Sequence, residues 1–64
     1  MQINRIKLIA LMAQKRMTCE ELAQKANVSR NTVSKLRAGY RCQNVVGVAI
    51  ARGLGVDITE LLDE

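Results

Sequence analysis

The chain has 64 residues, with 10 lysines and arginines against 6 aspartates and glutamates, which gives a net charge of +4 at pH 7. A domain of this size buries only about 60% of its unfolded surface, so it has no interior for an enclosed substrate or cofactor cavity. It has two cysteines and no histidine, which leaves a tetrahedral metal site short of ligands. We therefore expect one binding domain spanning 1–64, not an enzyme, with no catalytic residues, no metal and no cofactor.

The cysteines and the apolar runs indicate where the protein works. Cys19 and Cys42 have no recognisable spacing and no signal peptide precedes them, which fits a reducing cytoplasm and free thiols. Inert thiols are favoured over the alternative, a redox switch. The longest apolar run, Leu8 to Ala13, falls far below the ~18 residues of a membrane-spanning helix. We expect a cytoplasmic protein with no membrane partner.

The charges are segregated along the chain. Residues 22–56 carry basic side chains and no acidic one, and the acids are confined to 20–21 and 57–64. A basic body with an acidic end would orient on a polyanion, and nucleic acid is the obvious one. An ordinary solvated helix surface is the alternative interpretation of the same charges.

The apolar side chains indicate helices. They come from alanine, valine, isoleucine, leucine and methionine, with Tyr40 as the one aromatic, which is typical of packed helices rather than of a sheet. Residues 4–15 are predicted to form the first helix, with Leu8, Leu11 and Met12 on its inward face. We therefore expect an all-α domain.

A capping box opens the second predicted helix. The Thr18 hydroxyl can accept a hydrogen bond from the Glu21 amide, and the Glu21 carboxylate can accept one from the Thr18 amide. Asn27, which tolerates a left-handed backbone, ends this helix. Ser29 is then a good N-cap for a third helix, which Gly39 stops.

Two more helices are predicted in the C-terminal third, which makes five in all. Asn44 can cap the fourth helix, which ends at Gly55, and Asp57 can cap a short fifth. Gly47 and Gly53 fall inside the fourth helix, where each costs about 1 kcal/mol relative to alanine. Either another backbone comes close at these glycines or the helix is soft.

Two segments carry a family resemblance. Residues 18–36 read TCEELAQKANVSRNTVSKL, and residues 51–62 read ARGLGVDITELL. They resemble the helix-turn-helix and the closing helices of the Cro and lambda-repressor-like DNA-binding family, and the likeness covers nearly the whole chain. The resemblance implies a compact five-helix lambda-repressor-like domain, with its helix-turn-helix at about 18–38.

The chain departs from the family pattern at four places. Cys19 stands where the family usually has a glutamine that helps to fix the recognition helix on a DNA phosphate, and Asn27 replaces the glycine of the turn. The backbone amide of Cys19 can still face a phosphate. Arg37 stands where a glutamate is common, and it adds positive charge beside the expected DNA surface. Residues 42–43 occupy a loop that often holds a proline.

The third helix supplies the candidate base-reading side chains. Val33 and Leu36 must face the core, so the polar residues around them project away from it, with Thr32 at an intermediate edge. An arginine can fork onto guanine and an asparagine can pair with adenine in the major groove. Ordinary solvent-facing polarity is the alternative. The candidate base readers are Arg30, Asn31, Thr32, Ser34 and Lys35.

A second set of polar residues flanks this helix. Hydroxyl, guanidinium, amide and backbone N–H groups at such positions can bind DNA phosphates. Helix capping, surface charge and, for the tyrosine, cover of the core edge are the alternative roles. The candidate phosphate contacts are Thr18, Cys19, Ser29, Tyr40, Arg41 and Asn44.

Some apolar residues exceed what the expected core needs. Ile3, Ile6, Ile9, Ala10 and Ala13 form a second stripe on the first helix, and Val45 and Val48 lie outside the core face of the fourth. Such surplus marks an interface more often than a core, although an N-terminal tail that folds back is the alternative. Members of the family commonly bind palindromes as two-fold dimers, so we expect a homodimer through one of these surfaces.

These features together predict a sequence-specific regulator of transcription that binds double-stranded DNA. The resemblance favours a repressor that occupies a palindromic operator through the major groove, in the bacterial or phage nucleoid. The alternative is a protein-interaction module, antitoxin-like or an adaptor, whose apolar stripes bind a partner and whose DNA binding is secondary or lost.

Overall fold

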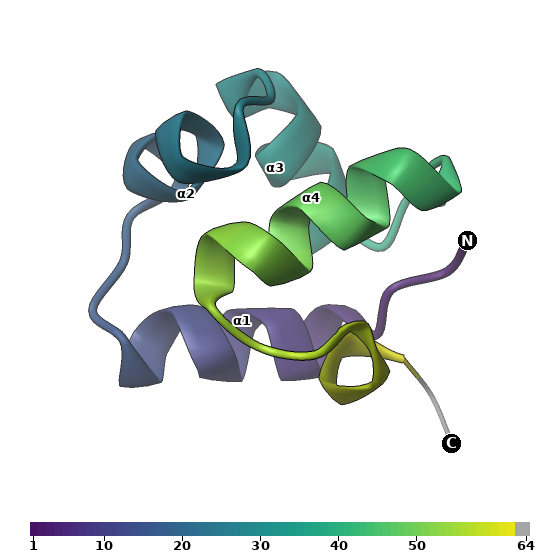
Figure 1. Cartoon of the computed structure of the whole chain (residues 1–64), viewed down its shortest axis with the longest axis horizontal. Helices are drawn as coiled ribbons and strands as arrows, with labels where there is room; N and C mark the ends of the chain where they lie inside the picture. The colour runs from purple at the N-terminus through teal and green to yellow at the C-terminus, as the bar shows by residue number, and fades with distance from the viewer. Residues whose placement is uncertain (63–64) are drawn as a thin grey trace.

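Short connections join the helices of the computed structural model, which describes residues 1–62. In Figure 1, α1 lies at the bottom, α4 crosses the middle, and α2 and α3 lie together at the top. In chain order the elements are α1 (Arg5–Gln14), α2 (Cys19–Ala26), α3 (Arg30–Arg37), α4 (Asn44–Leu54) and the 3-10 helix η1 (Ile58–Leu61). The expected all-α fold class is confirmed. Asp63 and Glu64, part of the predicted acidic end, lie outside the described residues.

The predicted fifth helix is present as a single 3-10 turn rather than as an α-helix. Asp57 caps it as predicted, because its Oδ1 accepts a hydrogen bond from the Thr59 amide at 3.0 Å. The turn ends where Leu62 becomes extended and pairs with Ile3 in an antiparallel bridge. The described fold therefore has four α-helices and this short turn.

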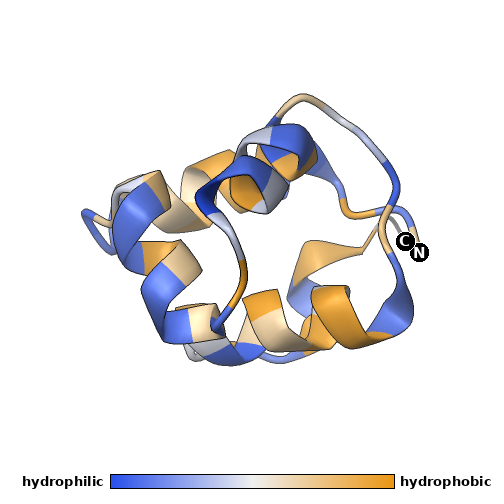
Figure 2. Cartoon of the chain, turned by 90° about the horizontal axis from the view of Figure 1, so that it is seen from above, coloured by the Kyte–Doolittle hydropathy of each residue, from blue (hydrophilic) through white to orange (hydrophobic). Residues whose placement is uncertain are grey.

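The core collects one face from each element. Each α-helix carries both apolar and polar residues, seen as orange and blue bands in Figure 2. The largest fully buried side chains are Ile3, Leu8, Leu22, Val33, Leu36, Ile50 and Leu61. Full burial of a side chain of this size contributes about 1.5–3 kcal/mol, so the two core residues of α3 hold that helix firmly in one orientation.

Close packing accounts for the two glycines within α4. A Cβ at Gly53 would lie 3.1 Å from the backbone nitrogen of Ala26, so α2 and α4 meet almost backbone to backbone. A Cβ at Gly47 would meet Sδ of Met1. Of the two explanations that the sequence left open, close approach of another backbone is found at Gly53, whereas the nearest neighbour of Gly47 is a side chain.

The N-terminal segment folds back onto other elements. Ile3 is 1% exposed, and the Asn4 amide donates to the Leu61 carbonyl at 2.7 Å. The Met1 nitrogen donates to the Cys42 carbonyl at 2.6 Å, and the Cys42 amide donates to the Met1 carbonyl at 2.9 Å. Because this pairing directs Ile3 into the core, its predicted place in a surface stripe is wrong, and the folded-back tail is the arrangement found.

Candidate nucleic-acid interface

A capping box fixes the start of α2. Oγ1 of Thr18 accepts from the Glu21 amide at 3.1 Å, and Oε1 of Glu21 accepts from the Thr18 amide at 2.9 Å. The prediction of this box is confirmed. A hydroxyl that accepts one hydrogen bond still has a proton to donate, so Thr18 can cap the helix and contact a phosphate at the same time.

A tight turn joins α2 to α3. Asn27 ends α2 in the left-handed conformation, with φ 58° and ψ 44°, and the Val28 amide donates to the Ala23 carbonyl at 3.0 Å. Ser29 then caps α3, with its Oγ accepting from the Thr32 amide at 3.1 Å. Both the predicted helix end and the predicted cap are confirmed, and α2, the turn and α3 form a helix-turn-helix.

α3 has an apolar inward face and a polar outward face. Val33 and Leu36 are 0% and 1% exposed. Thr32 is half-buried, and its Oγ1 lies 2.8 Å from Oγ of Ser29, so its hydroxyl is engaged within the first turn. The candidate base readers that are fully on the exposed face are Arg30, Asn31, Ser34 and Lys35.

The phosphate candidates lie in three places around this face. They are Thr18 and Cys19 at the start of α2, Ser29 before α3, and Tyr40, Arg41 and Asn44 along and just after the α3–α4 connection. Asn44 does not cap α4 as predicted. Gln43 holds the cap position, with φ −73°, ψ 156° and no side-chain hydrogen bond, because Asn44 is already helical.

Hydrogen bonds hold the α3–α4 connection to the N-terminal segment and to α3. Gly39 turns with φ 98°, and its carbonyl accepts from Nε2 of Gln2 at 3.1 Å. The Tyr40 amide donates to the Lys35 carbonyl at 3.0 Å. Tyr40 itself is 62% exposed, so it lies open beside the end of α3 rather than covering the core edge.

One contact across the helix-turn-helix was not predicted. Nη1 of Arg37 donates to Sγ of Cys19 at 3.0 Å. Both residues stand at positions where the chain departs from the family pattern, and that joint departure was the only signal in the sequence. The contact itself forms only when the end of α3 folds beside the start of α2.

The carboxylates near the basic surface are few. Residues 22–56 contain none, and the next one along the chain, Asp57, is engaged at the start of η1. The Thr59 amide and the Thr59 hydroxyl both donate hydrogen bonds to this carboxylate. These bonds lower the pKa of Asp57, the amide bond more than the hydroxyl bond.

Among residues 1–62 no three histidine, cysteine or acidic side chains are grouped to hold a metal. No helix in the described part is long and apolar enough to cross a membrane.

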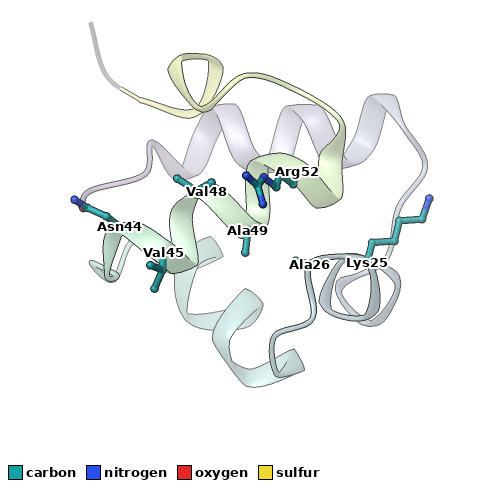
Figure 3. A pocket seen from close by; sticks show the side chains of 7 residues that line it. All are labelled: Lys25, Ala26, Asn44, Val45, Val48, Ala49 and Arg52. Carbon is teal, nitrogen blue, oxygen red and sulfur yellow. The ribbon is translucent and has the colours of Figure 1, made fainter.

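An open groove lies between the end of α2 and the outer face of α4 (Figure 3). Its volume is about 470 Å³. Val45 and Val48, at its apolar part, are 73% and 37% exposed. Its lining residues are Lys25, Ala26, Asn44, Val45, Val48, Ala49 and Arg52.

Solved structures that share this fold belong to much longer enzymes. The chain superposes on a mutant of hydroxyethylphosphonate dioxygenase with a TM-score of 0.86, and on native PhpD with cadmium with a TM-score of 0.83. Identity is 22% in both, and the superposition covers 100% of this chain and 14% of each enzyme chain. At this identity the likeness concerns the fold alone. No curated protein sequence matches the chain.

A family comparison agrees with the geometry of α2 and α3. The Cro/C1-type HTH DNA-binding domain matches residues 7–63, which include both helices and the turn between them. The resemblance carried by residues 18–36 is thereby confirmed. The chain belongs to the family of Cro/C1-type helix-turn-helix DNA-binding domains.

Proposed function

We propose that the protein regulates transcription by binding one double-stranded DNA sequence, an operator, with α3 in the major groove. The observation that carries the proposal is the open polar face formed by Arg30, Asn31, Ser34 and Lys35. Arginine can donate to O6 and N7 of guanine, and asparagine can pair with N6 and N7 of adenine. Thr32 contacts the DNA from the edge of this face.

Phosphate contacts supply affinity that is independent of sequence. A protein that neutralises phosphates releases counterions from DNA, so its affinity falls as salt rises. Contacts of this kind fix the register of α3 on the duplex and let its side chains reach the base edges. The contributing residues are Thr18, Cys19, Ser29, Tyr40, Arg41 and Asn44.

The regulator acts by occupancy rather than by chemistry. A repressor bound at an operator excludes polymerase from the same stretch of DNA. The place of action is the bacterial or phage nucleoid, in a cytoplasm whose reducing conditions suit the free thiols of Cys19 and Cys42.

A homodimer on a palindromic operator completes this proposal. Two-fold symmetry sets two copies of α3 about one DNA turn apart. Since Ile3 is in the core, the stripe on α1 keeps Ile6, which is 61% exposed, the half-buried Ile9, and the exposed Ala10 and Ala13. Val45 and Val48 are exposed and line the groove, so we assign the dimer contact to this face of α4.

Selection of bound duplexes from a randomised DNA pool tests the function. The most enriched duplex and a scrambled duplex are then each titrated with the protein at two salt concentrations. We expect a palindromic motif that is bound at least ~10³-fold more tightly than the scrambled control. Binding of any duplex with equal affinity would contradict the proposal.

The groove favours a second candidate function. Exposed Val45 and Val48 also suit a module whose main partner is another protein, with weak and unselective DNA binding. The same selection separates the two candidates, because this module enriches no motif. Sedimentation at high micromolar concentration, with and without operator DNA, tests the homodimer, and a monomer in both would exclude it.

A further inference from the structure

The side chain of Arg37 reaches from the last residue of α3 to the first residue of α2. Nη1 of Arg37 lies 3.0 Å from Sγ of Cys19, which is half-buried, whereas Arg37 is exposed. The two residues are 18 positions apart in the chain. The contact therefore holds a long, flexible cationic side chain in one place across the helix-turn-helix.

The contact leaves the charge and most of the donors of Arg37 available. A guanidinium has five N–H donors, and a thiol is a neutral and weak acceptor. Within residues 1–62 the Cys19 sulfur is the one hydrogen-bond partner of this side chain. The Glu21 carboxylate accepts the Thr18 amide at the start of α2. A guanidinium that has free donors and no carboxylate partner among the described residues is suited to an anion from outside the chain.

We propose that Arg37 is a DNA phosphate-binding residue and that Cys19 is the residue that positions it. This inference rests on the proposed binding of DNA through α3. The planar guanidinium matches a phosphate with two parallel hydrogen bonds, which a lysine cannot form.

The position of Arg37 favours a phosphate over a base edge. Residues at the N-terminal part of a recognition helix contact bases, and Arg30 and Asn31 lie there. Arg37 lies seven residues after Arg30, about 10 Å further along the helix axis. Its side chain also runs toward α2 rather than along the outward face of α3. It therefore reaches the sugar–phosphate backbone beside the major groove of the DNA.

The thiol reduces the loss of freedom on binding. An arginine side chain that becomes immobile at an interface loses rotamer freedom, and part of that ordering is already done in the free protein. Cys19 therefore supports the contact without meeting the DNA through its own side chain. This role of the Cys19 side chain is separate from the phosphate contact of the Cys19 backbone amide.

The first test compares Arg37→Gln with Lys15→Gln, which removes the same charge. Lys15 is exposed at the end of α1, and Figure 1 shows α1 at the bottom of the molecule and α3 at the top. Affinity for a fixed duplex is measured by fluorescence anisotropy over a range of salt. We expect Arg37→Gln to bind roughly tenfold more weakly and to reduce the slope of log K against log salt by about 0.9, with base preference unchanged. Lys15→Gln should keep the slope.

The second test separates positioning from charge. Cys19→Ala leaves the net charge unchanged but removes the acceptor, so we expect roughly threefold weaker binding with the salt slope retained. Cys19→Ser keeps an acceptor and should restore most of the affinity. Arg37→Lys keeps the charge, so its slope should be retained while its affinity falls.

Two results would overturn the inference. An unchanged salt slope for Arg37→Gln would remove Arg37 from the DNA contacts, and equal binding by Cys19→Ala, Cys19→Ser and the unsubstituted protein would remove the positioning role. Thermal unfolding of every variant shows whether the fold is kept. The slope is measured on a duplex of any sequence, so absence of a preferred operator would contradict the proposed function and leave this test intact.

Discussion

Gly53 lies directly against Leu22: a Cβ at residue 53 would stand 3.0 Å from Cδ1 of Leu22. The same Cβ would be 3.1 Å from both Cβ and the backbone nitrogen of Ala26. The leucine methyl can turn aside, but a backbone nitrogen within α2 can move only if the helix moves. The spacing of α2 and α4 therefore depends on a missing side chain.

Gly53→Ala should lower the stability of the fold. Alanine improves helix propensity by about 1 kcal/mol, but overpacking costs about 1–3 kcal/mol, and the backbone contact puts this site on the unfavourable side. Urea unfolding followed by circular dichroism measures the change.

Gly47→Ala is the matched control for that substitution. The nearest atoms to its new Cβ belong to the flexible Met1 side chain, which can swing away. We expect unchanged or slightly higher stability, because the gain in helix propensity offsets the lost methionine contact. A larger loss at Gly47 than at Gly53 would contradict this account of the helix contact.

Arg30→Ala and Asn31→Ala should each weaken binding of the preferred duplex by about 1–3 kcal/mol and relax the preference at one base position. The reason is that a bidentate contact with a base edge discriminates between bases. Arg41→Ala should instead weaken binding of all sequences alike, since a phosphate contact carries no sequence information. Repeated selection with each variant makes the comparison. Unchanged preferences in both α3 variants would show that α3 is not the reading helix.

Thr18→Ala should destabilise the domain through loss of the capping box. Replacement of such a cap costs about 1 kcal/mol. In a domain of this size, 1 kcal/mol lowers the melting temperature by about 4–8 °C. Thr18→Ser keeps the hydroxyl and should melt close to the unsubstituted protein. If the alanine and serine variants melted together, the cap would contribute nothing measurable.

The Asp57 cap should make a small part of the stability depend on pH. Hydrogen bonds from the amide and then the hydroxyl of Thr59 lower the pKa of Asp57 from 3.8, its ordinary value. A carboxylate with a depressed pKa in the folded state stabilises the fold above that ordinary value, and the contribution disappears as pH falls through the folded pKa. Asp57→Asn should therefore melt lower at neutral pH, and the difference should shrink below pH 3.8. A difference that is constant from neutral to strongly acid pH would contradict this role.

The sequence predicted the local caps and turns correctly, whereas it did not predict the contacts between distant segments. The Thr18 box, the Asn27 turn and the Ser29 cap each involve residues within a few positions, so composition and spacing determine them. The burial of Ile3 depends on pairing with Leu62, at the other end of the chain. Leu62, which makes this pairing, is extended and directly follows the last turn. An interpretation of α1 as an isolated helix therefore placed Ile3 on the surface.

The candidate site divides in the same way. The outward face of α3 follows from the burial of Val33 and Leu36, which helical periodicity already indicates. The bond between Arg37 and Cys19 joins positions 18 apart and depends on the packing of α2 against α3. Asn44 was misplaced by one residue because asparagine is a preferred cap, whereas the cap position is held by Gln43, whose side chain makes no capping hydrogen bond.

Because Tyr40 is exposed, its intrinsic fluorescence can report DNA binding without an added label. The chain has one tyrosine, no tryptophan and no phenylalanine, so its intrinsic ultraviolet emission comes from this single phenol ring. That ring is outside the core, beside the end of α3. Emission should therefore respond strongly to DNA that reaches the α3–α4 connection and only weakly to loss of core packing. Unlabelled protein can thus report binding by a signal that is largely separate from unfolding.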